Sequence, residues 1–225
     1  MLPIGDANPS KRFPLVTVLF IAINVIVFVY QITLPRQALN QFIRSAAIIP
    51  AQVVENPGLD SLWSIITSTF LHGGLLHIAG NMLYLWIFGD NVEETLNHVG
   101  YGVFYLLAGI VAAIAQIAMN PASTTPMLGA SGAVAGILGF YAVMFPRARV
   151  RTLIFLFIFV TFINLPALVV LGFWFVLQLF QGVAALGANT TGGVAWFAHI
   201  GGFALGMLVG FGYRISGKPV NRGYR

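Results

Sequence analysis

Long stretches without any charged side chain constrain this chain more than any other feature. The 225 residues include only 11 Lys and Arg and 6 Asp and Glu, and none of these lies within residues 61–89, 95–146 or 152–213. Charged residues make up 8% of the chain and the mean hydropathy is +0.89, whereas about a quarter of an average soluble domain is charged. A soluble domain needs more charge to cover its surface. The composition therefore excludes a soluble enzyme, a disordered tail and a fibrous protein, and it predicts an integral membrane protein.

The uncharged stretches contain six segments that are apolar enough for a membrane span, which takes about 20 residues. These segments are residues 14–34, 72–89, 101–119, 129–145, 166–187 and 195–213. We interpret them as helices, because backbone groups in lipid must pair within the segment and the alternation of a barrel strand is missing. The predicted fold is an all-α membrane bundle with six transmembrane helices. It forms one domain over residues 1–225, without an appended soluble domain.

The basic residues predict the orientation of these spans. With six spans and a cytoplasmic N-terminus, nine Lys and Arg residues lie inside and two, Arg36 and Arg44, lie outside, as the positive-inside rule favours. A seventh span within residues 152–188 would move the last four basic residues outside. We therefore expect both termini in the cytoplasm, with residues 153–165 in the cytoplasmic interface or packed on the bundle. The basic residues indicate topology and not nucleic acid binding.

Polar groups open three of the predicted spans. His72, His77 and Asn81 open the second, Ser131 opens the fourth, and His199 opens the sixth. In the six-span topology these three spans all enter from the outside, so the polar groups share one depth in the outer half of the membrane. Polar residues inside a membrane are costly and indicate function by default. Three segments that place polar groups at one level therefore predict a site.

The spacing of the histidines predicts which of them face the site. His77 and Asn81 are four residues apart, so they lie on one face of a helix. His72 is five residues before His77, about 140° around a helix, and we expect it to face elsewhere.

Rows of small residues predict how the site is assembled. Gly202 and Gly206 continue the stripe of His199 along the last span, and Gly132 begins a GxxxG motif directly after Ser131. Such rows let two helix backbones approach closely in lipid. We therefore expect the fourth and sixth spans to pack together and to bring His199 to Ser131.

A serine beside a neutral histidine is a nucleophile with its base. The predicted spans contain no Asp or Glu, so the sequence indicates a Ser131–His199 dyad and not a triad. The oxyanion of the intermediate needs hydrogen-bond donors. The backbone N–H of Ser131 at a helix start, together with His77 and Asn81, meets that need. The chain contains no cysteine, and this chemistry requires no metal and no cofactor.

Three motifs together resemble the rhomboid intramembrane serine proteases, in their prokaryotic six-span form. The motifs are HGGLLHIAGN at residues 72–81, GASG at 129–132 and AHIGG at 198–202. The resemblance implies a six-helix bundle in a prokaryotic cell membrane, with its active site toward the outer face, that cleaves transmembrane segments of other membrane proteins. It implies that Ser131 is the nucleophile and His199 the base, with oxyanion stabilisation by His77, Asn81 and the Ser131 amide.

The resemblance also implies supporting roles around the site. These fall on His72, which would help water to reach the site, and on Gly129, Gly132, Gly202 and Gly206. The fifth span and the loop at residues 187–194 would gate substrate access. Two positions depart from the family pattern: Ser64 follows Trp63 where the family often has arginine, and Ala135 stands where an aromatic ring often stacks on the base.

Three other classes of protein remain open at this point. A catalytically silent rhomboid-like protein would bind membrane proteins without cleaving them. A haem protein would use His77 and His199 as axial ligands, which leaves Ser131 unexplained. A channel or transporter would carry charged or broken-helix sites near the midplane, where this sequence has no acidic residue.

Overall fold

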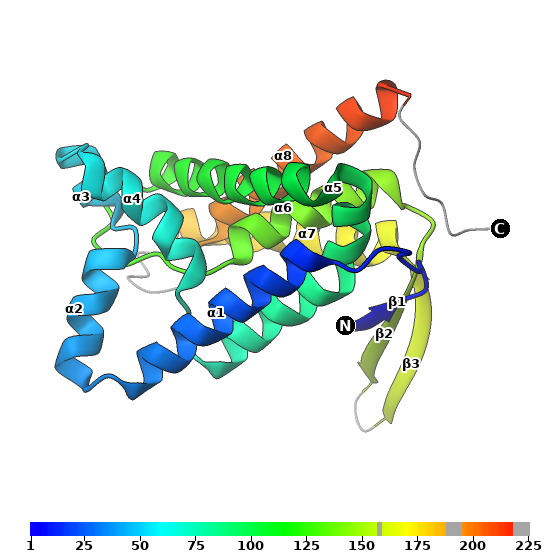
Figure 1. Cartoon of the computed structure of the whole chain (residues 1–225), viewed down its shortest axis with the longest axis horizontal. Helices are drawn as coiled ribbons and strands as arrows, with labels where there is room; N and C mark the ends of the chain where they lie inside the picture. Colours follow the sequence, from blue (N-terminus) through cyan, green and yellow to red (C-terminus); the bar gives the residue numbers. More distant parts are fainter. Residues whose placement is uncertain (157–158, 188–194, 218–225) are drawn as a thin grey trace.

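The structure of the chain, a computed structural model, describes residues 1–156, 159–187 and 195–217. Five helices form the bundle and three short helices with one 3₁₀ turn connect the first two of them (Figure 1). The bundle helices are α1 (Leu15–Thr33), α5 (Leu75–Met119), α6 (Ser131–Met144), α7 (Ala167–Gly187) and α8 (Trp196–Ile215). The connecting elements are α2 (Arg36–Ala46), α3 (Pro50–Glu55), α4 (Leu59–Thr67) and η1 (Ser68–Phe70). Three strands complete the described part, β1 (Leu2–Asp6), β2 (Arg149–Leu156) and β3 (Phe159–Pro166).

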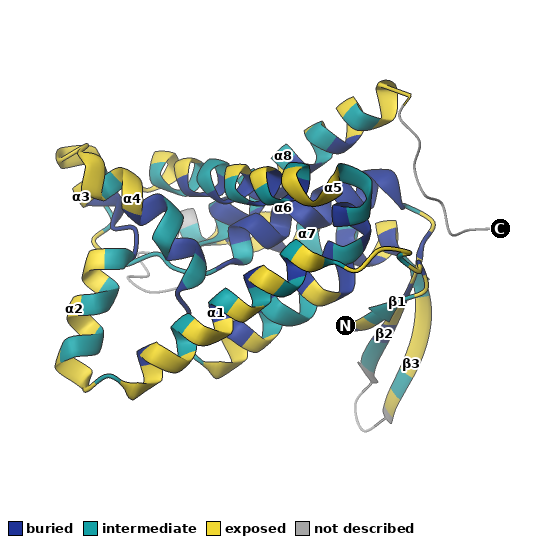
Figure 2. Cartoon of the chain, viewed as in Figure 1, coloured by how far each residue is buried: buried dark blue, intermediate teal, exposed yellow. Residues whose placement is uncertain are grey.

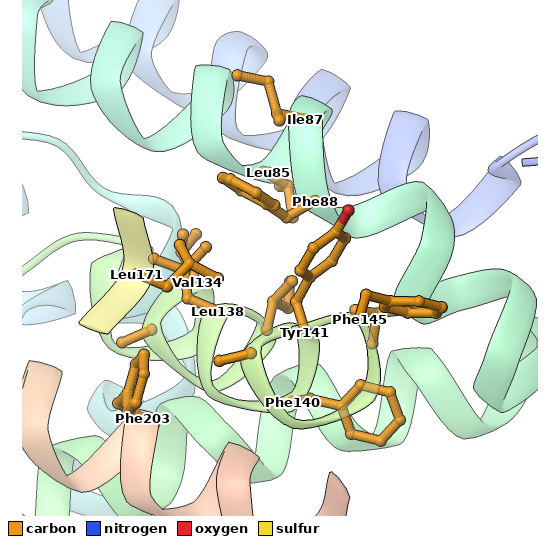
Figure 3. Close-up of a cluster of buried hydrophobic side chains, with 14 of the residues drawn as sticks. Leu85, Ile87, Phe88, Val134, Leu138, Phe140, Tyr141, Phe145, Leu171 and Phe203 are labelled. Atoms are coloured by element: carbon orange, nitrogen blue, oxygen red, sulfur yellow. The ribbon is translucent and has the colours of Figure 1, made fainter. Parts of the chain in front are cut away.

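Helix α6 is the centre of the bundle. Every residue from Gly132 to Met144 is buried, whereas the surrounding helices expose one face (Figure 2). Side chains from α5, α6, α7 and α8 form the main hydrophobic core around it, with Phe88 and Tyr141 in T-shaped ring contact (Figure 3). The element that carries the predicted nucleophile is therefore enclosed by protein.

Four of the described helices are long and apolar enough to cross a membrane: α1, α5, α7 and α8. Helix α6 is apolar but has only 14 residues. The helices begin and end close to the predicted spans, with small differences: α5 begins at Leu75 and not at residue 72, and α6 begins at Ser131 and not at 129.

Helix α5 combines the second and third predicted spans. Its backbone is non-helical at Asn97, with φ 62° and ψ 168°, so two helices meet there. The acidic residues at 90–94 lie between the two predicted spans, and the helix continues through them.

Glu93 connects the acidic turn of α5 to the start of α1. Its carboxylate is buried and accepts hydrogen bonds from the backbone N–H groups of Val16 and Thr17, both at 2.8 Å, and from the Thr17 hydroxyl at 2.7 Å. The first N–H groups of a helix have no partner within the helix. Glu93 therefore caps the start of α1 from a different helix and joins the two elements at one end of the bundle.

The sheet corrects the prediction of an all-α chain. Strands β1, β2 and β3 form an antiparallel sheet in that order, and β2 pairs with β3 from Arg149–Pro166 to Leu156–Phe159. Arg149 and Arg151 are exposed while Val150 and Thr152 are buried, which is the two-residue period of a strand. The hairpin lies at one end of the bundle and runs across the direction of the helices (Figure 1). Of residues 153–165, those that the structure describes, 153–156 and 159–165, belong to the strands at this end of the bundle.

Candidate active site

Helices α6 and α8 contact each other through their backbones, as the rows of small residues predict. A methyl group added to Gly202 would lie 2.1 Å from the carbonyl oxygen of Gly132, and one added to Gly206 would lie 1.9 Å from that of Gly136. Gly139 faces the backbone of α8 in the same way, with Phe203 O at 2.1 Å. No larger residue fits at these positions without a shift of one helix.

This contact brings the two predicted catalytic side chains together. The Oγ atom of Ser131, the first residue of α6, lies 2.8 Å from Nε2 of His199 in the first turn of α8. The two residues are 68 positions apart in the chain. His199 is only 7% exposed and Ser131 is half-buried, so the histidine of the pair is shielded from bulk solvent.

Gln178 is a residue of the site that the sequence analysis missed. Its Oε1 atom lies 2.6 Å from Nδ1 of His199, on the opposite side of the ring from Ser131, and its side chain is buried. Gln178 belongs to α7, a largely apolar helix whose other glutamine, Gln181, is exposed. The same rule that marks polar residues inside a membrane as functional applies to it and gives the signal that could have found it.

Aromatic rings from α7 and α8 take the place of the aromatic residue missing at position 135. The ring of Trp174 lies 5.8 Å from that of His199 at an interplanar angle of 36°, and the ring of Trp196 lies 6.1 Å away edge-on. Ala135 is completely buried, and its Cβ atom would lie 3.4 Å from a methyl group on Gly202. A large ring at 135 has no room in this packing, so another helix supplies the stacking partner.

Gln116 is a second missed residue, and it fixes the start of α8. Its Oε1 atom accepts hydrogen bonds from the backbone N–H groups of Phe197 at 3.1 Å and Ala198 at 3.3 Å. Because unpaired N–H groups at a helix start need acceptors, Gln116 caps α8 from α5. The cap lies directly before His199.

His77 and Asn81 lie beside the loop that leads to Ser131. Gly129 has a φ of 130°, a conformation that favours glycine. A methyl group there would lie 2.8 Å from Nε2 of His77 and 3.8 Å from Nδ2 of Asn81. Nδ1 of His77 accepts a hydrogen bond from the N–H of Gly73 at 3.4 Å, so Nε2 carries the hydrogen. A donor of His77 therefore lies next to the approach to Ser131.

The prediction that His72 faces away from this cluster is wrong. Its Nε2 atom accepts a hydrogen bond from Nδ2 of Asn81 at 2.9 Å, and its ring packs edge-on against that of His77 at 5.1 Å. Because α5 begins only at Leu75, His72 precedes the helix and the angle of a helical wheel does not apply to it. The side chain of Gln31 holds the backbone of His72 in place. Its Oε1 atom accepts a hydrogen bond from the N–H of His72 at 3.0 Å, and its Nε2 atom donates one to the carbonyl oxygen of His72 at 3.1 Å.

The surroundings of the pair are otherwise small and apolar. A pocket of about 30 Å³, room for about one water molecule, lies beside Ser131 and is lined by Ser68, Thr69 and Gly129 among others. Ser64 is buried in α4 and donates to Ser61 O at 2.7 Å. Within the described ranges no group of three metal-binding side chains occurs. Gly187, the first residue of the predicted gating loop at 187–194, ends α7, and residues 188–194 lie outside the described residues.

The fold and the site define a class of protein. A bundle of apolar helices encloses a serine, a histidine and a glutamine between α6, α7 and α8, at the start of the two helices that touch backbone to backbone. Such a molecule is an integral membrane protein with a polar site held inside the bundle. The family model of the rhomboid domain matches residues 59–216, and the chain belongs to the rhomboid family.

Several curated proteins are similar to the chain. RHOMBOID-like protein 4 of Arabidopsis thaliana is 32% identical over 152 residues, which are 68% of this chain and 34% of that protein. The mitochondrial Rhomboid protein 1 of Saccharomyces cerevisiae is 32% identical over 153 residues, 66% of this chain and 41% of its own length. The Rhomboid protease GluP of Bacillus subtilis is 40% identical over 77 residues, 34% of this chain and 15% of that protein.

The chain thus matches well under half of the length of these relatives. They come from a plant, a yeast and a bacterium, and one carries a mitochondrial name. The similarities support an integral membrane protein of the rhomboid family. They do not support the predicted location in a prokaryotic inner membrane.

Proposed function

We propose that the chain is an intramembrane serine endopeptidase that cleaves transmembrane segments of other membrane proteins with a Ser131–His199 pair. The observation that carries this proposal is the 2.8 Å contact between Ser131 Oγ and His199 Nε2 inside the bundle. It has the geometry of an activated nucleophile and its base. The rhomboid family supports it, as does a relative named a rhomboid protease.

The reaction follows from the donors and acceptors around this pair. Ser131 Oγ attacks the carbonyl carbon of the peptide bond while His199 Nε2 takes the hydroxyl proton. The resulting oxyanion accepts hydrogen bonds from the N–H of Ser131, from Nε2 of His77 and from the amide of Asn81. His199 then gives its proton to the leaving amine. Water, activated by the same nitrogen, releases the acyl group and restores the serine.

We also propose the six-span topology, with a single domain over residues 1–225. The N-terminal strand β1 and the rest of the sheet lie at one end of α6, and Ser131 lies at the other end (Figure 1). With the sheet in the cytoplasm, the active site opens toward the outer face and α7 borders the route of the substrate. Reporters fused after Arg151 and after Arg225 should read cytoplasmic, and one within residues 189–193 should read external. A C-terminus that reads external would disprove the six-span count.

A serine-directed probe tests the chemistry. A fluorophosphonate should label the purified protein, and Ser131→Ala should abolish both labelling and cleavage of a transmembrane reporter. His199→Ala should lose both as well, because the serine then lacks its base. Ser45→Ala, an exposed serine on α2, is the matched control and should keep full activity. Cleavage by Ser131→Ala would end the proposal. A folded wild type without labelling or cleavage would favour the silent membrane-protein binder.

The oxyanion donors have a separate signature. His77→Ala and Asn81→Ala should lower kcat more than they raise KM, because the oxyanion exists only in the transition state and the intermediate. Loss of one such donor costs about 10²–10³ in rate where donors are not redundant. If both variants and the double variant keep the kcat of the wild type, the oxyanion assignment is wrong.

A further inference from the structure

The base of this site has a neutral partner on its second nitrogen. We propose that Gln178 is a positioning residue, which holds the His199 ring in the tautomer and orientation that the reaction needs. This inference rests on the proposed function and adds a third side chain, from a third helix, to the predicted pair.

The hydrogen bonds on the two ring nitrogens assign the tautomer. The amide oxygen of Gln178 accepts and cannot donate, and it lies 2.6 Å from Nδ1 of His199. The hydrogen of the neutral ring therefore sits on Nδ1. Nε2 is left with a free lone pair at 2.8 Å from Ser131 Oγ, where it can take the hydroxyl proton. Without an acceptor at Nδ1, part of the population would carry its hydrogen on Nε2 and could not act as the base.

Burial makes this hydrogen bond the main control on the ring. Gln178 and His199 are each 7% exposed, so water competes little for Nδ1. Trp174 lies one helical turn before Gln178 on the same face of α7, and its ring lies 5.8 Å from the imidazole. Helix α7 thus fixes one edge of the ring with a hydrogen bond and covers its face with an aromatic group.

The chemistry of the interior explains why the partner is an amide. The chain has no Asp or Glu after Glu94, so α6, α7 and α8 offer no carboxylate. An ionised carboxylate between apolar helices is costly, whereas a glutamine oxygen accepts the same hydrogen bond without a charge. A neutral acceptor orients the base but stabilises the imidazolium less than a carboxylate does. We therefore expect Gln178 to contribute about ten- to a hundred-fold to kcat, less than the roughly 10²–10⁴-fold of a general base itself.

Three variants on α7 separate positioning from structure. Gln178→Leu removes the acceptor, and Gln178→Glu keeps an acceptor oxygen at the same position. Gln181→Leu is the matched control, because Gln181 lies about one helical turn further along α7 and its side chain is exposed. For each, kcat and KM are measured with a transmembrane reporter in proteoliposomes, and thermal unfolding is followed in parallel. ¹⁵N NMR of histidine-labelled protein, assigned with His199→Ala, reports which ring nitrogen carries the hydrogen.

The expected result is a fall of about ten- to a hundred-fold in kcat for Gln178→Leu with KM nearly unchanged. Its ¹⁵N spectrum should show His199 with the hydrogen distributed over both nitrogens, whereas the wild type shows it on Nδ1. Gln178→Glu should recover most of kcat, and Gln181→Leu should match the wild type. A Gln178→Leu variant with the kcat and Nδ1–H signal of the wild type would overturn the inference, and so would a Gln178→Glu variant that unfolds at the wild-type temperature without recovering kcat. Neither outcome would contradict the proposed function. That proposal fails only if the wild type is inactive or if Ser131→Ala still cleaves the reporter.

Discussion

The α6–α8 contact and the α7 side of the site position His199 in different ways. Between α6 and α8, glycines bring backbone against backbone, so that a methyl group on Gly206 or Gly202 would come within about 2 Å of a carbonyl oxygen. Helix α7 reaches the same histidine through the long side chains of Gln178 and Trp174. On this helix Gly172 has open space around it, with nothing within 4 Å of an added methyl group.

The two regions therefore control different features of the site: the distance between Ser131 and His199, and the orientation of the His199 ring. Backbone contact leaves no clearance, so it fixes how far the nucleophile lies from its base. Side-chain contact tolerates small movements of α7 but sets the plane and the tautomer of the ring. We expect substitutions in the first region to damage packing and catalysis together. In the second region they should change turnover while the fold persists.

Gly206→Ala should have the largest effect. Its added methyl group meets Gly136 O at 1.9 Å and the backbone N of Phe140 at 2.8 Å, so one helix must shift. Overpacking costs about 1–3 kcal/mol of unfolding free energy, and a small displacement of catalytic groups costs about 10² in rate. Thermal unfolding and reporter cleavage in liposomes measure both losses.

Two further glycines are matched controls for this variant. Gly172→Ala on α7 and Gly212→Ala on α8 meet nothing within 4 Å, and alanine is the better helix former. Both variants should cleave at the wild-type rate and unfold at the same or a slightly higher temperature. If Gly206→Ala behaves like them, backbone contact does not set the distance between Ser131 and His199.

Trp174→Leu should have a smaller effect, confined to turnover. It removes the ring that lies against His199 at 5.8 Å, a contact worth about 0.5–1.5 kcal/mol, which corresponds to a fall of up to roughly tenfold in kcat. Phe173→Leu, at an exposed neighbour on the same helix, is the control. A large loss of thermal stability without a change in kcat would remove the distinction between the two regions.

Asp6→Asn should leave cleavage unchanged and affect only the pH dependence of stability, at the far end of α6. Burial raises the pKa of Asp6 from 3.8 to about 7, and this outweighs the opposing effect of the hydrogen bond from Tyr141 of α6. Between these values the folded chain keeps a proton that the unfolded chain has lost, so stability falls as the pH rises from about 4 to about 7. Asp90 adds to the rise through its charge.

Melting curves at pH 5.5 and pH 8 measure this effect. The wild type should unfold at a lower temperature at pH 8, and Asp6→Asn should reduce the difference between the two temperatures. Asp60→Asn, an exposed carboxylate on α4, should retain the wild-type difference. An equal pH dependence in wild type and Asp6→Asn would show that Asp6 does not hold the far end of α6 through its protonation.

The sequence predicts the part of the site that depends on spacing. Rows of glycine repeat at helical intervals, so the packing of α6 on α8 and the meeting of Ser131 with His199 follow from position alone. Gln178 lacks such a pattern, because two glutamines in a largely apolar helix do not reveal which of them faces the histidine. His72 was misplaced because the helix start at Leu75 is not marked by a capping side chain.

The sheet shows the same limit for the fold. The alternation of Arg149 and Arg151 with Val150 and Thr152 extends over few residues. The uncharged segment that follows is equally compatible with a membrane span and with a buried strand. Pairing with β1, about 150 residues earlier in the chain, completes the sheet. No local pattern contains that partner, so the strands could not be predicted where the helices could.

The short length of α6 has a consequence for the membrane around it. Its 14 residues make a helix of about 21 Å, less than the roughly 30 Å of a hydrocarbon layer, and protein covers it on every side. A thicker or thinner bilayer therefore acts on α1 and α7, whose apolar side chains are exposed and which can tilt. Ser131 and His199 are tied to each other and not to the lipid surface. For the proposed peptidase, we expect bilayer thickness to select which peptide bond of a substrate arrives at Ser131, while the chemistry at that bond stays the same.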